Sequence, residues 1–201
     1  MTKPGTVVWF CGLPGSGKTT VSRLVVELLE KKEIETVYLS LDEVRRRIFP
    51  NPSYSDEERD TAYRAFVLVA SILCKNGHNV VLDATAHKKV WRDLAREECH
   101  DFVEVYVKCP VETCMERETQ REGQNLVRKK LYLGALERLR TGTAIAGLGK
   151  LPGVDEPFEE SPSPEVTIDS SHEKPETLAL QVLEGLRKLN FPALSAPVRE
   201  R

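Results

Sequence analysis

The sequence lacks the features that mark membrane, secreted and nucleic-acid-binding proteins. No apolar run approaches the length that spans a membrane, and residues 1–5 lead directly into a β-prone run, so we expect no secretory signal. The 29 basic and 31 acidic residues leave a net charge of −2, which argues against binding of nucleic acid through bulk electrostatics. We therefore expect a cytoplasmic protein with neither a membrane nor a nucleic-acid partner.

The spacings of metal and redox sites are also absent. The five cysteines are scattered, odd in number and without a C-x-x-C pair, so they predict neither a zinc site nor a redox motif. We expect most of them to be buried as small apolar side chains in a reducing compartment. The histidines show no pairing with cysteine or carboxylate, and we assign no role to His78, His87, His100 and His172.

One glycine-rich segment is present and complete: Gly12-Leu13-Pro14-Gly15-Ser16-Gly17-Lys18-Thr19. An apolar run precedes it and a helical pattern follows it, which is the strand-to-helix context of a phosphate-binding loop. Its glycines let successive N–H groups converge on phosphate oxygens at a helix N-terminus. We expect Lys18 to reach the β- and γ-phosphates as a binding and catalytic residue, and the Thr19 hydroxyl to take one position on Mg²⁺. The segment through Thr20 therefore predicts a nucleoside triphosphate site, with ATP and Mg²⁺ as cofactors.

Strand-like and helical segments alternate along the chain. Strands are predicted at Thr6–Cys11, Thr36–Ser40, Asn79–Asp83, Phe102–Val107 and Glu165–Ile168. Helices are predicted at Lys18–Lys32, Glu57–Lys75, His87–Glu98, Val111–Arg121 and Pro175–Leu189. This alternation predicts an α/β fold, a P-loop kinase-like three-layer sandwich with a central five-stranded parallel sheet and helices on both faces. We expect residues 1–190 to form this single domain and residues 191–201 a flexible tail.

Two segments interrupt the alternation. Residues 121–150 are predicted to be a lid-like insertion, a basic lid that closes over ATP; the alternative is a solvated helix face with scattered cations. The cations concerned are Arg117, Arg121, Arg128, Lys129 and Lys130. Residues 151–164 hold four prolines among acidic residues and are predicted to be an irregular loop.

Ligands of such a sheet bind beyond the carboxyl ends of its strands, where the sequence places two carboxylates. Asp42, after the second strand, is predicted to be the catalytic base that orients a hydroxyl and accepts its proton. Asp83 ends the third strand and is predicted to support Mg²⁺. For both residues a helix cap or a turn is the alternative interpretation.

Several arginines are expected near the same cleft. Arg45, Arg59 and Arg64 lie on segments predicted to border it, and guanidinium forks suit phosphate or sulfate oxygens. For each of them taken singly, a solvated surface position is the alternative. Arg92, on the following helix, is predicted to face either phosphate or solvent.

These motifs resemble those of the adenylylsulfate kinase family over most of the chain, from Val7 to about Leu189. The matching segments are the phosphate loop, Asp42 with Arg45, Tyr54-Ser55 with Arg59, Phe102–Val107, Cys114–Arg117, Lys129–Tyr132, Gly153–Glu159 and Pro164-Glu165. The resemblance implies transfer of the ATP γ-phosphate to the 3′-hydroxyl of adenosine 5′-phosphosulfate (APS), a small-molecule nucleotide. The sequence leaves the formation of a homodimer undecided.

The resemblance also implies roles for single residues. Asp42 would be the base, Arg45 and Arg59 would bind the phosphosulfate, and Tyr54 would stack on the substrate adenine, with Leu151 in the place of a second stacking residue. Lys129 would be a lid lysine that contacts substrate or ATP. Arg117 is grouped with the residues that bind ATP.

The chain departs from the family's pattern at several pocket positions. Ser40 replaces an acidic residue two positions before the base, and two asparagines and a phenylalanine are replaced by Glu43, Ala62 and Leu151. The family's Ser-Phe-Ile-Ser-Pro segment reads Asp83-Ala84-Thr85-Ala86-His87. Together with Arg92, this segment resembles small P-loop kinases of polynucleotide ends, seryl-tRNA or sugars. The alternative function is therefore phosphoryl transfer to another small hydroxylated metabolite or nucleotide.

Overall fold

Five parallel strands form one central sheet in the computed structural model, which describes residues 3–120, 131–142, 149–189 and 191. The strands are β1 (Thr6–Cys11), β2 (Thr36–Ser40), β3 (Asn79–Asp83), β4 (Asp101–Lys108) and β5 (Val166–Asp169). Their order is β2-β3-β1-β4-β5, and every neighbouring pair is parallel. From β1 the chain passes to the edge strand β2 and returns through β3 on one side, and it then runs outward through β4 and β5 on the other side. The loop after β1 therefore lies at the point where the strand order reverses, which is where such sheets bind ligands.

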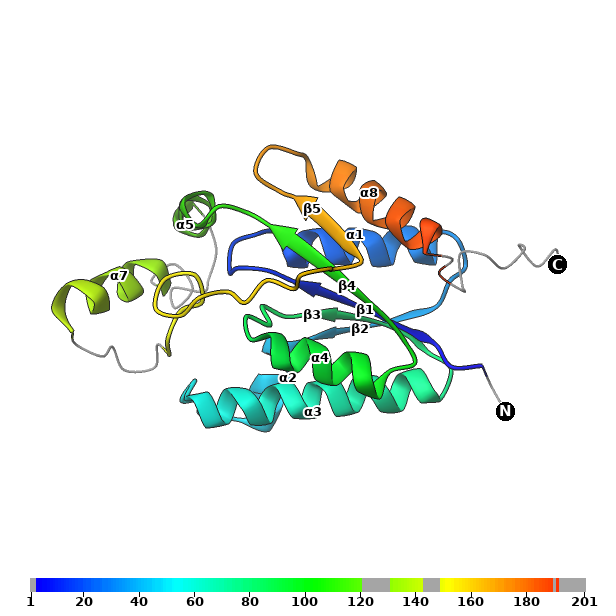
Figure 1. The fold of residues 1–201 in the computed structure, drawn as a ribbon, viewed down its shortest axis with the longest axis horizontal. Coiled ribbons are helices and arrows are strands. Elements are labelled where there is room, and N and C mark those ends of the chain that lie inside the picture. Colours follow the sequence, from blue (N-terminus) through cyan, green and yellow to red (C-terminus); the bar gives the residue numbers. More distant parts are fainter. Residues whose placement is uncertain (1–2, 121–130, 143–148, 190, 192–201) are drawn as a thin grey trace.

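Helices cover both faces of the sheet (Figure 1). One face carries α1 (Lys18–Glu30) and α8 (Pro175–Lys188), and the other carries α2 (Leu41–Ile48), α3 (Asp56–Lys75) and α4 (Lys89–Glu98). Alternate side chains of β1 point to opposite faces. Val8 and Phe10 pack in the cluster with α1 and α8, whereas Val7 and Trp9 pack in the cluster with α3 and α4. Two apolar cores thus enclose a fully buried central strand.

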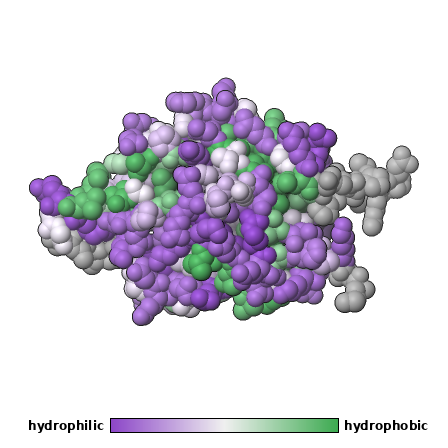
Figure 2. All heavy atoms as spheres, viewed as in Figure 1, coloured by the Kyte–Doolittle hydropathy of each residue, from purple (hydrophilic) through white to green (hydrophobic). Residues whose placement is uncertain are grey.

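Two further helices lie beyond the carboxyl ends of the strands (Figure 1): α5 (Val111–Gln120) and α7 (Leu131–Thr141). The inner side of α7 is buried through Tyr132 and Ala135. Its other side leaves Leu133, Leu136 and Leu139 exposed, and Figure 2 shows apolar side chains over this helix. α7 belongs to the segment predicted to be a lid. Arg121, Arg128, Lys129 and Lys130 of that segment lie outside the described residues.

The five predicted strands and the three-layer architecture are confirmed, and the differences have local causes. The helix predicted from His87 begins at Lys89 because Ala86 has a φ of 48° and Lys88 is extended. α2 and α7 were not predicted as separate helices. α2 is short, and α7 lies among the scattered charges of the lid segment. All five cysteines are buried and free, as expected. No helix in the described part of the chain is long and apolar enough to span a membrane.

Arg92 faces neither phosphate nor solvent, so that expectation was wrong. Its side chain is 1% exposed, and its Nε lies 3.0 Å from Glu104 Oε1 on β4. Its other nitrogens donate to the backbone oxygens of Ala86 and Glu159. Ser161 Oγ donates to the Glu104 carboxylate at 2.7 Å. The buried ion pair therefore ties residues 159–161 of the proline-rich loop to the sheet.

We expect Arg92→Met to lower the free energy of unfolding by about 3–5 kcal/mol, because it leaves the buried Glu104 carboxylate with only the partly exposed Arg96, 3.7 Å away, as a counter-ion. Urea denaturation measures the loss. The control is Arg187→Met, which removes an exposed pair with Glu184 and should cost less than about 1 kcal/mol. Equal losses in the two variants would contradict this account of the pair.

Candidate active site

The backbone of the phosphate loop has conformations that strongly favour glycine at three positions. Gly12, Gly15 and Gly17 have φ values of 147°, 84° and 86°. A Cβ at Gly12 would lie 2.5 Å from the Val107 carbonyl oxygen, and one at Gly15 would lie 2.6 Å from that of Cys114. Gly17 is the N-cap of α1, so the loop ends at the positive end of a helix dipole. The loop is therefore shaped to bind phosphate.

Asp83 lies where a metal-supporting carboxylate should be. Thr19 Oγ1 donates to Asp83 Oδ2 at 2.6 Å, and the Tyr38 hydroxyl donates to the same oxygen at 2.8 Å. A hydroxyl that donates to a carboxylate keeps its lone pairs for a cation. The described residues contain no group of three or more His, Cys, Asp or Glu that could hold a metal. This donor set fits Mg²⁺, which one carboxylate, a hydroxyl, water and substrate phosphates can hold.

A cavity of about 550 Å³ joins the phosphate loop to most of the predicted substrate residues. Its wall includes Lys18 and Thr19, and also Asp42, Arg45, Tyr54, Arg59, Asp83 and Leu151. Lys18 Nζ lies 3.4 Å from the Leu13 carbonyl oxygen. These residues come from the phosphate loop, the ends of β2 and β3, α2, α3 and the proline-rich loop. The fold thus gathers side chains that are distant in the sequence around one space.

Asp42 lies in the first turn of α2 and is exposed to the cavity. The N-cap of this helix is Ser40, so Asp42 is not the capping residue that the alternative interpretation required. An exposed carboxylate on this wall is chemically able to accept a proton from a bound hydroxyl.

Arg45 is held in a buried ion pair. Its Nη1 donates to Glu58 Oε1 at 2.7 Å, and its guanidinium lies 5.1 Å from the centre of the Tyr54 ring. Glu58 Oε2 accepts hydrogen bonds from the Ser53 hydroxyl at 2.8 Å and from the Tyr54 N–H at 3.0 Å. Burial raises the pKa of Glu58, but the bonds from Ser53 and Arg45 outweigh it and hold the pKa below its usual range. Glu58 therefore fixes both Arg45 and the turn that carries Tyr54.

Arg59 is oriented by the segment that leads into the proline-rich loop. Its Nε donates to the Tyr54 carbonyl oxygen at 3.1 Å, and its Nη2 donates to that of Lys150. Gly149 lies against Tyr54 and Arg59, because a Cβ at this position would lie 2.5 Å from the Tyr54 Cβ and 2.9 Å from Arg59 Nη2. Arg64 was expected near the cleft, but it is an exposed residue of α3 that pairs with Asp60 one turn away.

His87 is buried on the cavity wall and pairs with the partly buried Glu156, a contact that the sequence analysis missed. His87 is 2% exposed, and its Nε2 lies 2.9 Å from Glu156 Oε2. The same carboxylate lies 4.0 Å from Arg59 Nη1 and 3.1 Å from Lys150 Nζ. Burial first, and then the charge of Arg59, lower the pKa of His87 to about 4, although Glu156 opposes them. A neutral imidazole beside a carboxylate carries its proton on the facing nitrogen, so Nε2 is the donor.

The substituted family positions do not all face the cavity. Ser40 and Leu151 line it. Glu43 is exposed and lies 3.8 Å from Arg23. Ala62 is 0% exposed and packs in the core beneath α3. Ala62 has no polar side-chain atom, so it cannot take over the recognition role of the asparagine that it replaces.

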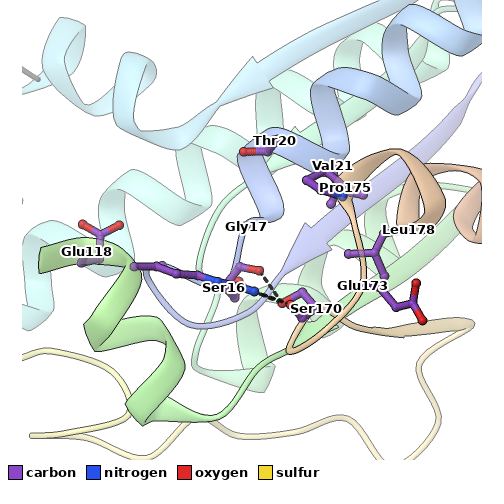
Figure 3. Close-up of a pocket in the computed structure, with 11 residues that line it drawn as sticks. Ser16, Gly17, Thr20, Val21, Glu118, Ser170, Glu173, Pro175 and Leu178 are labelled. Carbon is purple, nitrogen blue, oxygen red and sulfur yellow. Dashed lines mark hydrogen bonds between the residues drawn. The ribbon is translucent and has the colours of Figure 1, made fainter. Parts of the chain in front are cut away.

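A second cavity, of about 360 Å³, also borders the phosphate loop (Figure 3). Its wall includes Gly15, Ser16, Gly17, Thr20, Arg117, Glu118, Ser170 and Glu173. Arg117 Nη1 lies 3.3 Å from Ser170 Oγ, which in turn donates to the Ser16 carbonyl oxygen at 2.8 Å. Arg117 thus links α5 to the loop after β5, and the cavity opens directly beside the phosphate loop.

Comparisons with known proteins agree with this geometry. The family model described as adenylylsulphate kinase matches residues 4–169. The chain belongs to the adenylylsulfate kinase family. A probable adenylyl-sulfate kinase from Archaeoglobus fulgidus is 35% identical over 164 residues, which cover 82% of this chain and 95% of that protein. An adenylyl-sulfate kinase from Picosynechococcus sp. is 31% identical over 191 residues, which cover 95% and 98%. The family predicted from the motifs is confirmed, and with it the prediction of a kinase.

Solved structures share the fold. The APS kinase of Mycobacterium tuberculosis in complex with AMPPNP and APS superposes with a TM-score of 0.73 at 29% identity, over 92% of this chain and 98% of that one. A gluconokinase from Sinorhizobium meliloti has a TM-score of 0.60 at 20% identity, over 98% of this chain and 100% of that one. The likeness to the gluconokinase shows the fold alone.

We expect the stability of the protein to fall as the pH drops from about 6.5 to about 4, partly through His87. Its pKa is lowered from 6.5 to about 4, so the unfolded chain takes up a proton in this range while the folded chain does not. Urea unfolding at several pH values measures the slope. Other groups titrate here as well, so the comparison is with His87→Gln, whose slope should be shallower between these values. Parallel slopes would contradict the assignment.

Proposed function

We propose that this chain transfers the γ-phosphate of ATP to the 3′-hydroxyl of APS, giving ADP and 3′-phosphoadenosine 5′-phosphosulfate. The observation that carries the proposal is the single cavity that contains the phosphate loop, Asp42 and the pair of arginines, Arg45 and Arg59. A second support is the family, which includes the structure solved with AMPPNP and APS.

The nucleotide binds across the phosphate loop in this proposal. The loop holds the β- and γ-phosphates through its N–H groups and Lys18. The ribose and base extend into the smaller cavity, beside Ser170 and the guanidinium of Arg117. Thr19 and Asp83 hold Mg²⁺, which when bound offsets the charge that develops on the transferred group.

The acceptor binds at the opposite end of the larger cavity. Arg45 and Arg59 present guanidinium groups to the phosphosulfate, and the Tyr54 ring and Leu151 flank the adenine. Asp42 accepts the proton of the 3′-hydroxyl as its oxygen forms a bond to the γ-phosphorus and the bond to the β,γ-bridging oxygen breaks. Lys129 stays a predicted lid contact, and it lies outside the described residues.

An acceptor assay tests the substrate. With ATP and Mg²⁺ present, ADP release followed by a coupled assay should depend on APS and saturate with it. Gluconate and adenosine 5′-monophosphate serve as comparison acceptors, because one represents sugar acids and the other lacks the sulfate. A folded, ATP-binding protein that forms no ADP with APS, or that prefers gluconate, would overturn the proposed acceptor.

The catalytic base is tested separately. Asp42→Asn should lower kcat by about 10²–10⁴-fold, the usual contribution of a general base, while the affinity for ATP stays similar. The matched control is Glu43→Gln, which removes a neighbouring exposed carboxylate that does not line the cavity. We expect the control to keep nearly full activity. Normal turnover by Asp42→Asn would remove that role from Asp42.

A further inference from the structure

The Glu156 carboxylate lies between His87 and Arg59. Its Oε2 accepts a hydrogen bond from His87 Nε2 at 2.9 Å, and the same oxygen lies 4.0 Å from Arg59 Nη1. The second distance exceeds the length of a hydrogen bond, so only the attraction of opposite charges acts between this oxygen and the guanidinium. Lys150 Nζ lies 3.1 Å from the other oxygen, Oε1. Both oxygens are therefore held, and the carboxylate stops short of Arg59.

The nitrogens of Arg59 are engaged unequally. Nε and Nη2 donate to the carbonyl oxygens of Tyr54 and Lys150. Within the ranges that the structure describes, Nη1 makes no hydrogen bond, and its ion pair is the long one with Glu156. Arg59 lines the larger cavity, so the two N–H groups of Nη1 remain for a ligand.

A small movement of Glu156 would occupy these donors. From 4.0 Å, a shift of about 1 Å gives a charge-assisted hydrogen bond between Glu156 and Arg59. Two contacts oppose this shift, and they differ in strength. Lys150 is an exposed side chain that also pairs with Asp56 at 3.2 Å, and exposed pairs restrain little. The hydrogen bond from His87, whose side chain is 2% exposed, is therefore the main restraint.

His87 is itself fixed well enough to act as a restraint. Its carbonyl oxygen accepts a hydrogen bond from the Glu159 N–H at 2.8 Å. Its ring meets the Trp91 ring edge to face, with the centres 5.1 Å apart. The preceding residue, Ala86, donates its N–H to the Tyr63 hydroxyl at 2.7 Å. An imidazole held in this way can restrain a neighbour without moving itself.

We propose that His87 is a positioning residue of the acceptor site: it holds the Glu156 carboxylate away from Arg59, so that Arg59 Nη1 can bind the phosphosulfate. Glu156 then competes with the ligand for Arg59, and one hydrogen bond restrains it. The inference rests on the proposed function, because it concerns how the same site binds APS.

The first test releases the carboxylate. His87→Leu removes the restraining hydrogen bond, and Glu156 then pairs with Arg59. We expect the KM for APS to rise about tenfold to hundredfold, the worth of a hydrogen bond to a charged group, while kcat and the KM for ATP stay nearly unchanged. The coupled assay of ADP release measures all three constants.

The matched control is His100→Leu, which removes an exposed histidine that lies 3.1 Å from Asp101, outside the cavity. It should change none of the three constants. A folded His87→Leu protein with the wild-type KM for APS would overturn the positioning role, and so would an equal loss in kcat and in both KM values, which a general structural defect produces.

The second test removes the competitor. Glu156→Gln takes away the charge that attracts Arg59, so its KM for APS should equal the wild-type value or fall below it. In the double variant His87→Leu/Glu156→Gln the KM for APS should return to that of Glu156→Gln, because no carboxylate is left to restrain. If His87 only supported the fold, the double variant would be as poor as His87→Leu.

Thermal unfolding shows whether each variant folds. If His87→Leu does not fold, Glu156→Gln decides alone, since a tenfold rise in its KM for APS would make Glu156 a partner of the ligand and overturn the proposal. A wild-type protein that does not phosphorylate APS overturns the proposed function and this inference together. Turnover of APS by the wild-type protein, with the contrary results in the variants, overturns the inference alone.

Discussion

The shape of the phosphate loop is the constraint on which the rest of the site depends. Its left-handed glycines bring the backbone against β4 and α5, so the carbonyl groups of the loop face other elements. The Tyr132 hydroxyl of α7 donates to the Pro14 carbonyl oxygen at 2.6 Å, and Ser170 after β5 donates to that of Ser16. Elements more than a hundred residues away in the sequence are thus fixed relative to the phosphates. A shift of the loop would move both cavities together.

Carboxylates with little exposed surface hold residues at and around the larger cavity. Glu58 and Glu104 form buried ion pairs with Arg45 and Arg92, and the partly buried Glu156 accepts a hydrogen bond from the neutral His87. Buried ion pairs contribute little net stability, because desolvation offsets the attraction, but breaking one is costly. Their effect is to specify geometry. They explain how a loop rich in proline and without regular secondary structure presents Leu151 at a defined place.

The sequence predicted what is encoded locally. The phosphate loop depends on adjacent residues and fixed glycine positions, so its strand-to-helix context was sufficient. Asp42 and Asp83 followed from the rule that the carboxyl ends of parallel strands share an edge. The hydrogen-bond partners of those residues were harder to predict from the sequence. Tyr38 meets Asp83 only because β2 pairs with β3, and that pairing order is not written in either strand.

Other features needed contacts that no local pattern carries. His87 and Glu156 are 69 residues apart, and the histidine resembles any other until its neighbour is known. Arg92 was expected at a surface or a phosphate because arginine is seldom fully buried. Its burial depends on Glu104 of β4 and on the backbone oxygens of Ala86 and Glu159. The prediction for Arg64 was wrong in the opposite sense, because this residue was expected at the cleft and lies at the surface. It follows Arg59 on α3, but the intervening residues turn it onto the solvent side of the helix.

Arg45 and Arg59 both lie against carboxylates, and this pairing bears on how the cavity selects an anion. Arg45 lies against Glu58, and Arg59 lies 4.0 Å from Glu156, so the local charge is nearly balanced before a ligand enters. A balanced site attracts anions weakly at long range. A guanidinium has five N–H donors in a fixed plane. Arg45 uses a donor on Glu58, and Arg59 uses donors on the carbonyl oxygens of Tyr54 and Lys150, so both side chains keep donors for a ligand. Selection by such a site depends on where the acceptor atoms lie, because pre-oriented donors favour the ligand whose oxygens match them.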